Sequence, residues 1–169
     1  MPGSVERPHV AVVGGSTVDE ETAGVATELG RQLARRGAVV VCGGLGGVME
    51  AACRGAGAEG GTTVGILPGD DRRQANPWVE VAVPTGMGEA RNALVVRTAD
   101  VVVAVAGEFG TLSEIALALR TGKAVVGLST WELARGGSPV EAIERAAGPE
   151  EAAERAVELA RARLAEPEA

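Results

Sequence analysis

The chain has 169 residues, enough for one domain with its own core, and we expect a single domain over residues 1–169. Aromatic residues make up only 2% of it, so Val, Leu, Ile and Ala must form the core. The net charge of −7 argues against a general surface for nucleic acid or anionic membranes. Because the N-terminus lacks an apolar signal core and no run of about 18 apolar residues exists, we expect a cytoplasmic protein without nucleic-acid or membrane partners.

Apolar runs that end in glycine alternate with segments of helical periodicity along the chain. In chain order, the predicted strands are residues 9–15, 38–44, 62–68, 78–84, 100–106 and 123–128. The predicted helices are residues 17–36, 46–58, 86–99 and 111–121, and residues 69–77 form a polar loop. Continuously apolar strands that alternate with helices indicate a parallel sheet covered on both faces. We therefore predict an α/β fold, a Rossmann-like, doubly wound, three-layer parallel sheet of six or seven strands.

The C-terminal segment contains two helix signals. Ser138, Pro139 and Glu141 have the pattern of a helix start, with an N-cap, an N1 proline and a capping-box acid. Whether residues 139–147 form a helix or a strand nevertheless stays open. Gly148 and Pro149 restart the chain, and residues 149–164 predict an amphipathic C-terminal helix with a solvated charged face.

Glycine-containing turns follow predicted strands at residues 14–17, 43–47 and 107–111. In a parallel sheet with right-handed crossovers, these turns fall at one edge, where ligands bind near the switch in strand order. Free N–H groups and positive helix ends there favour an anion such as phosphate, although tight turns need glycine for structural reasons too. The residues expected to contact a phosphorylated ligand are Gly15, Ser16, Gly43, Gly44, Gly46, Gly47, Gly107, Gly110 and Thr111.

Two further segments supply polar side chains near that edge. Arg91, followed by Asn92, lies in a predicted helix otherwise lined by small and apolar residues, and an arginine fork matches phosphate or ribose oxygens well. The loop at residues 69–77 is predicted to be a mobile lid that brings Arg72 or Asn76 to the ligand. A merely solvated loop is the alternative.

Several common sites are absent from the sequence. There is no P-loop motif, the first turn lacks the dinucleotide glycine pattern, and Cys42 stands where an acid would bind ribose, which argues against NAD. No acidic or histidine cluster suggests a metal site. His9 lies near the start of the first strand, away from the ligand edge. Cys42 and Cys53 lack zinc spacing, and we expect both to be buried structural thiols.

The segment "GEFGTLSEIALAL" places one acid, Glu114, in an otherwise apolar predicted helix. In one interpretation Thr111 caps the helix and Glu114 completes a capping box. In the other, Glu114 lies on the floor of the ligand site. The helix is apolar around more than one face, so it is buried, and a chain of this size needs a partner subunit for that. We expect a homodimer or homotetramer.

Residues 8–130 resemble the LONELY GUY-like superfamily, whose members are often mislabelled as lysine decarboxylases. The resemblance is carried by "CGGLGGVMEAACRGA" and by the run from "GILPG" to "AVVGL". The segments "GILPGDDRRQANP" and "TGMGEARN" are similar to the molybdenum-cofactor-carrier-like branch, which is related to DprA/Smf proteins. This resemblance implies a Rossmann-like fold, a nucleotide-type ligand and homo-oligomers.

The hydrolase branch of that superfamily removes the base from nucleoside 5′-monophosphates and carries an arginine ahead of "PGGxGTxxE". Arg91 and Glu114 fall on the arginine and glutamate positions, and Gly110 and Thr111 match the "GT". The resemblance implies that the Gly and Thr backbone holds phosphate. Arg91 and Glu114 would act at the ribose and glycosidic bond, and they would be catalytic only in a hydrolase.

Two positions depart from the hydrolase pattern: Glu108 replaces the second glycine of "PGG", and Asn92 stands where lysine is usual. The carrier-like branch is described as binding molybdenum cofactor without hydrolysing nucleotides. We therefore favour a binding protein for a phosphorylated nucleotide-like ligand. The ligand would be an AMP-like nucleotide, phosphate or molybdopterin, and we expect no required cofactor. A phosphoribohydrolase and a ligand-free structural or signalling oligomer are the alternatives. A lysine decarboxylase is excluded because the only lysine, Lys123, ends a helix–strand turn and no pyridoxal motif exists.

Overall fold

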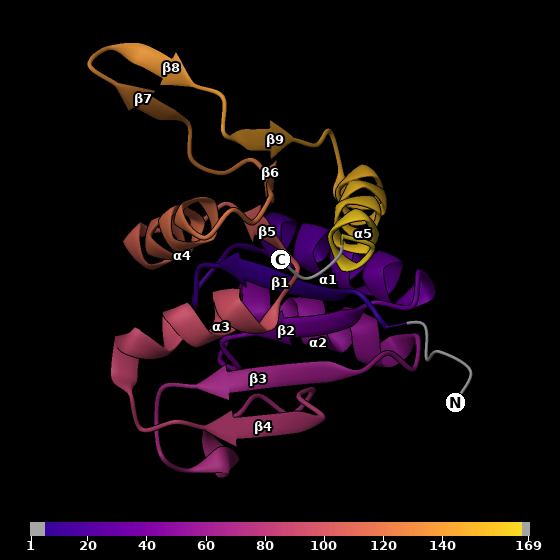
Figure 1. Cartoon of the computed structure of the whole chain (residues 1–169). Coiled ribbons are helices and arrows are strands. Elements are labelled where there is room, and N and C mark those ends of the chain that lie inside the picture. The colour runs from indigo at the N-terminus through magenta and orange to yellow at the C-terminus, as the bar shows by residue number, and fades with distance from the viewer. Residues whose placement is uncertain (1–5, 167–169) are drawn as a thin grey trace.

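Every strand pairing in the central sheet is parallel in the computed structural model, which describes residues 6–166. The strand order β4-β3-β2-β1-β5-β6-β9 reverses direction at β1, as in a doubly wound sheet (Figure 1). The predicted α/β fold with six or seven strands is confirmed. In sheet order the strands are Val81–Pro84, Thr63–Leu67, Val39–Cys42, His9–Gly14, Val101–Val105, Val125–Leu128 and Ile143–Arg145.

Helices cover both faces of the sheet (Figure 1), which is why its inner strands are apolar without alternation. Val10 and Val12 of β1 point to the face packed by α1, α2 and α5. Ala11 and Val13 point to the opposite face, packed by α3 and α4. None of the helices in residues 6–166 is long and apolar enough to cross a membrane. The helices are α1 (Glu20–Arg35), α2 (Val48–Ala58), α3 (Asn92–Thr98), α4 (Phe109–Arg120) and α5 (Pro149–Leu164).

Two glycines allow α1 and α2 to touch backbone to backbone. A Cβ atom on Gly30 would lie 2.0 Å from the carbonyl oxygen of Ala52, and one on Gly55 would lie 1.9 Å from that of Thr27. Side chains larger than hydrogen therefore cannot occupy this crossing. The close approach also fixes the start of α2, where the Val48 amide donates to the Gly15 carbonyl oxygen at 3.0 Å. The first two glycine turns are thereby held in contact.

The C-terminal segment differs from its predicted helix start. Residues 138–140 form β8 (Ser138–Val140), which pairs with β7 (Leu133–Arg135) in an antiparallel hairpin, and β9 then extends the main sheet. Gly136 and Gly137 both have positive φ, 57° and 82°, the backbone of a two-residue hairpin turn. This turn overrides the local capping signals that follow it, so the predicted helix start is wrong.

The predicted capping box in α4 is also wrong. The helix begins at Phe109, two residues before the predicted start, and its N-cap residue is Glu108, which makes no side-chain capping bond. Thr111 therefore lies within the first turn and Glu114 within the body of the helix. Similarly, predicted helix 86–99 is a 3-10 turn, η2 (Gly88–Arg91), followed by the shorter α3.

Lys123 follows α4, as predicted, and its side chain is buried. Its ammonium group donates to the carbonyl oxygens of Val96, Arg97 and Ala99. These are carbonyls at the end of α3, where a cation is favourable. Lys123, the only lysine of the chain, therefore fixes the C-terminal end of α3. The N-terminal end of the same helix lies at the candidate site.

A matched pair of alanine substitutions in α1 should separate helix propensity from helix packing. Gly30→Ala should lower the free energy of unfolding by about 1–3 kcal/mol, because the added methyl group meets the backbone of α2. Gly24→Ala should raise it by about 0.5–1 kcal/mol, because the space around Gly24 is open and the unfolded chain loses freedom. Urea unfolding of both variants measures the difference. Equal changes in the free energy of unfolding for the two variants would contradict the close crossing of α1 and α2.

Candidate functional site

A cavity of about 400 Å³ opens where β1, β2 and β5 end. Its wall includes Gly15 and Ser16 after β1, Gly43 after β2, and Gly110 and Thr111 in the first turn of α4. The three glycine turns therefore lie at one edge of the sheet, as predicted. The volume is within the range of sites for small molecules.

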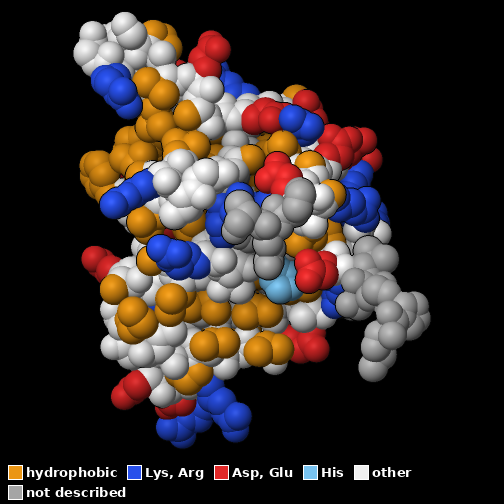
Figure 2. Space-filling view, in the orientation of Figure 1, with side chains coloured by type: hydrophobic (Ala, Val, Ile, Leu, Met, Phe, Trp, Pro, Cys, Tyr) orange, Lys and Arg blue, Asp and Glu red, His pale blue; other side chains and the backbone are white. Residues whose placement is uncertain are grey.

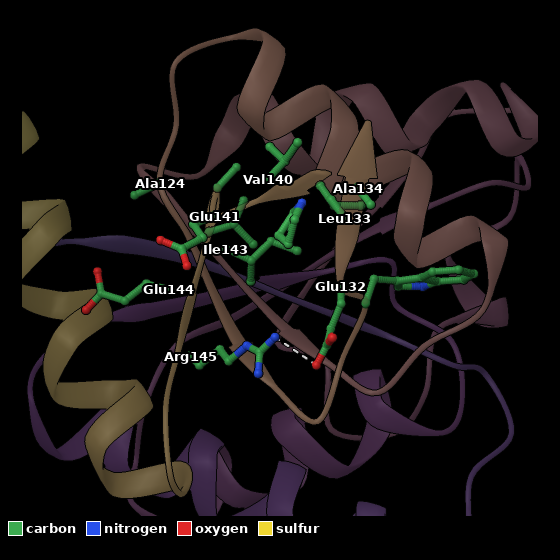
Figure 3. Close-up of a pocket in the computed structure, with 13 residues that line it drawn as sticks. Ala124, Glu132, Leu133, Ala134, Val140, Glu141, Ile143, Glu144 and Arg145 are labelled. Carbon is green, nitrogen blue, oxygen red and sulfur yellow. Dashed lines mark ion pairs between the residues drawn. The ribbon is translucent and has the colours of Figure 1, made fainter. Parts of the chain in front are cut away.

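A larger hollow, of about 960 Å³, lies between the edge of the sheet and the β7–β8 hairpin. Figure 3 shows its wall, where Leu133, Val140 and Ile143 lie to one side of an exposed ion pair between Arg145 and Glu132 with an N–O distance of 2.7 Å. Among the described residues, no buried charged side chain lines this hollow. The smaller cavity, which has two such side chains, is therefore the candidate site.

Arg91 is the buried cation of the candidate site, with 8% of the residue exposed. It ends η2, and its guanidinium lies so close to Gly43 that a Cβ atom there would be 2.6 Å from Nη1. Nη1 donates to Oδ1 of Asn92 at 2.7 Å. Nε is buried and has no hydrogen-bond partner among residues 6–166. Arg91 itself lines the cavity, so an anion bound there would lie beside a buried cation and stabilise it.

Glu114 lies beside Arg91 on α4 and is 6% exposed. Its Oε1 is 3.9 Å from Nη1 of Arg91. Burial raises the pKa of Glu114 to about 7, although the charge of Arg91 acts in the opposite direction. Burial also lowers the pKa of Arg91, which still remains protonated. Near neutral pH the Glu114 carboxyl group can therefore either donate or accept a proton.

The turn before α4 adjoins the cavity, whose wall includes Glu108 and Gly110. Gly107 has φ of 108°, and a Cβ atom there would lie 2.5 Å from the side chain of Thr111, so only glycine fits. Trp131 Nε1 donates to the Glu108 carbonyl oxygen at 3.3 Å and steadies the turn. The first amides of α4 have no partner within the helix and suit an anion. The Glu108 side chain, however, is exposed and lines the cavity.

The structure brings together many of the predicted ligand residues. The cavity wall contains Gly15, Ser16, Gly43, Arg91, Asn92, Gly110, Thr111 and Glu114. Gly44, Gly46, Gly47 and Gly107 lie in the same turns but not on the wall. Pattern reasoning missed Leu45, Met49, Pro68, Gly88 and Glu89. The signal that could have found the last two is their place directly before Arg91.

The two polar residues predicted on the loop at 69–77 lie away from the cavity wall. Arg72 is exposed at the start of a 3-10 turn, η1 (Arg72–Gln74). Asn76 braces the second glycine turn, because its Nδ2 donates to the Leu45 carbonyl oxygen and its amide to that of Gly44, both at 2.9 Å. Asn76 thus shapes the site from behind.

His9 begins β1, at the end opposite the cavity, as predicted. Its backbone amide donates to Asp100 Oδ2 at 2.8 Å. Within residues 6–166, no three His, Cys, Asp or Glu side chains come together in a group that could hold a metal ion.

The pattern of the SLOG cluster4 family matches residues 7–158, so the chain belongs to this family. An uncharacterized protein of Archaeoglobus fulgidus is 42% identical over 120 residues, which cover 71% of this chain and 79% of the relative.

Solved structures give the same assignment. The molybdenum cofactor binding protein of the phototrophic bacterium Rippkaea orientalis superposes with a TM-score of 0.80 and 33% identity, covering 90% of this chain and 96% of that one. The molybdenum cofactor carrier protein of Chlamydomonas reinhardtii superposes with a TM-score of 0.78 and 32% identity, covering 90% and 98%. The predicted relationship to the carrier-like branch is confirmed, and the similarity supports a ligand-binding role.

Replacing Glu114 by Gln should remove one pH dependence of folding stability. The carboxyl group has a pKa of about 7 in the folded chain, above its ordinary value of 4.5, so the folded state holds this proton more tightly. Its contribution is complete below pH 4.5 and is lost as pH rises through 7. Relative to the wild type, Glu114→Gln should gain about 3 kcal/mol of unfolding free energy between those limits.

The measurement is urea unfolding of both proteins across this pH range. Glu108→Gln serves as the matched control, because it removes an exposed carboxylate from the same cavity. A constant difference between the wild type and Glu114→Gln at every pH would contradict the raised pKa.

Proposed function

We propose that the protein binds a phosphorylated, nucleotide-like ligand and acts as a carrier, as molybdenum cofactor carrier proteins do. The observation that carries the proposal is the buried cation Arg91, which lines a cavity walled by glycine turns. An anion is the ligand that such a donor recognises. The names of the relatives from Rippkaea orientalis and Chlamydomonas reinhardtii support the same class of ligand.

The proposed ligand lies with its phosphate between Arg91 and the first turn of α4, where Gly110 and Thr111 line the cavity. The remainder of the cavity, bounded by Leu45 and Met49, takes the flat ring system. An AMP-like nucleotide, molybdopterin and phosphate alone all meet these requirements. The site needs no cofactor for binding.

The charge around the first turn of α4 favours binding over hydrolysis. Glu108 adds a carboxylate at the cavity wall, where the hydrolase pattern has glycine. Asn92 replaces the usual lysine and occupies one guanidinium donor of Arg91. Each opposed or missing charge-assisted contact costs about 1.5–3 kcal/mol, and hydrolysis is more sensitive to this loss because it must also stabilise the charge that develops in the transition state.

One observation supports the second candidate, a phosphoribohydrolase acting on nucleoside 5′-monophosphates. Glu114, with a pKa of about 7, lies 3.9 Å from Arg91. A carboxyl group poised near neutral pH suits proton transfer, and its ionised form suits an oxocarbenium-like centre at the glycosidic bond. A ligand-free structural or signalling oligomer is the third candidate, and it predicts that no phosphorylated compound binds.

Binding of AMP, followed by isothermal titration calorimetry, tests the leading proposal. Arg91→Ala should weaken binding by about 10- to 100-fold, because one charge-assisted contact to the phosphate is lost. Arg72→Ala is the matched control and should leave the affinity unchanged, because Arg72 is exposed and away from the cavity wall. Thr111→Ala should also weaken binding.

The same samples separate a carrier from a hydrolase. After incubation with AMP and related monophosphates, chromatography should detect little or no free base. Efficient release that disappears in both Arg91→Ala and Glu114→Ala would establish the phosphoribohydrolase instead. Equal affinities in Arg91→Ala and Arg72→Ala would reject the site itself.

The surface of a single chain also supports a homodimer or homotetramer. Trp78 is 45% exposed, Val81 on edge strand β4 is 46% exposed and Phe109 is 76% exposed. Figure 2 shows hydrophobic side chains gathered over β3 and its neighbours. Single soluble chains rarely expose such patches.

Sedimentation at micromolar concentration should give a dimer or tetramer, and Val81→Glu should shift the protein to a monomer. A wild-type monomer would contradict the proposal.

A further inference from the structure

The two cysteines of the chain lie in contact with one another. Cys42 ends β2 and Cys53 lies on α2, and both are buried free thiols, as predicted. Their Sγ atoms are 3.5 Å apart, the distance of a thiol hydrogen bond. The ligand site described above makes no use of this pair.

This thiol pair lies directly behind the wall of the candidate site. Cys42 is followed by Gly43, which lines the cavity and touches the Arg91 guanidinium. Met49 packs against the two thiols and also lines the cavity. Both cysteines are fully buried, and Gly43 and Met49 connect them to the cavity wall.

The surroundings distinguish the two sulfur atoms. Cys42 Sγ accepts from the Gly44 amide at 3.3 Å. The hydrogen bond to Cys53, together with the Gly44 amide and the charge of Arg91, lowers the pKa of Cys42. The same contact, together with burial, raises the pKa of Cys53. Cys42 is thus the more nucleophilic sulfur, and Cys53 is placed to attack it after oxidation.

We propose that Cys42 and Cys53 are a redox modification site, at which a hydroperoxide converts the thiol pair to an intramolecular disulfide that weakens the ligand site. The Cys42 thiolate attacks one oxygen of hydrogen peroxide; the O–O bond breaks, and the other oxygen leaves as hydroxide, which takes up a proton. Cys53 sulfur then attacks the Cys42 sulfenic acid, the S–O bond breaks, and a second water leaves with the thiol proton. The two thiols lose two electrons to the peroxide.

The disulfide would act on the site through Gly43. A disulfide bond is about 2.0 Å long, so the sulfur atoms, now 3.5 Å apart, must approach by about 1.5 Å. This movement draws the end of β2 toward α2 and alters the Gly44 contact to Cys42. Gly43 seats the Arg91 guanidinium, so the arginine changes position. The effect on ligand affinity rests on the proposed function, whereas the disulfide and the arginine displacement do not.

The first experiment treats the folded full chain with hydrogen peroxide and blocks remaining thiols before mass spectrometry. We expect a chain lighter by two hydrogen atoms, with a peptide linking Cys42 to Cys53, and full reversal by dithiothreitol. Cys53→Ala should instead stop at the Cys42 sulfenic acid, and Cys42→Ala should give neither product. Unmodified thiols, or disulfides only between chains, would overturn the proposal.

Two readouts then test the connection to the site. The Nε–H signal of Arg91 in a proton–nitrogen correlation spectrum, assigned with Arg91→Lys, should shift on oxidation in the wild type but not in Cys53→Ala. The affinity for AMP should fall about tenfold, equivalent to one charge-assisted hydrogen bond. A disulfide that leaves the Arg91 signal unchanged would overturn the proposal. A shifted signal in a protein that never binds AMP would refute the ligand assignment alone.

Discussion

The burial of the Arg91 guanidinium is the constraint on which the rest of the site depends. A buried cation costs several kcal/mol unless neighbouring groups compensate for lost water. Asn92 accepts one hydrogen bond, and Glu114 supplies a carboxyl group at 3.9 Å. Gly43 contributes by lacking a side chain, because any Cβ atom would occupy the space of the guanidinium. The glycine turn is therefore a fitted socket for the arginine.

Burial acts on the two charged residues of this socket in the same sense, toward neutrality. It raises the pKa of Glu114 to about 7 and lowers that of Arg91, which is still protonated. The socket therefore carries a cation that Glu114 only partly balances at neutral pH. An anion bound beside Arg91 would supply the missing charge and favour the protonated form of Glu114. Binding of phosphate would therefore favour the neutral form of Glu114, and the neutral form of Glu114 would in turn favour binding of phosphate.

The fold could be predicted from sequence because general rules decide it. Parallel strands and right-handed crossovers place every glycine turn at one edge, so Gly15, Gly43 and Gly110 had to meet. The Arg91–Glu114 pair came from family resemblance, since no periodicity shows that two polar side chains are buried together. The start of α4 was missed because Ala106 and Gly107, with φ of 47° and 108°, turn the chain early. Such backbone geometry is set by tertiary contacts.

The difference between a carrier and a hydrolase in this fold comes down to what surrounds the first turn of α4. Both need backbone amides and an arginine to hold phosphate, so Gly110, Thr111 and Arg91 do not distinguish them. Hydrolysis also requires that charge developing at the sugar be stabilised more strongly than the bound substrate. Here Asn92 already occupies one Arg91 donor, and Glu108 lines the cavity with a further carboxyl group. Neither feature adds stabilisation at the glycosidic bond, which is why the geometry supports reversible binding better than hydrolysis.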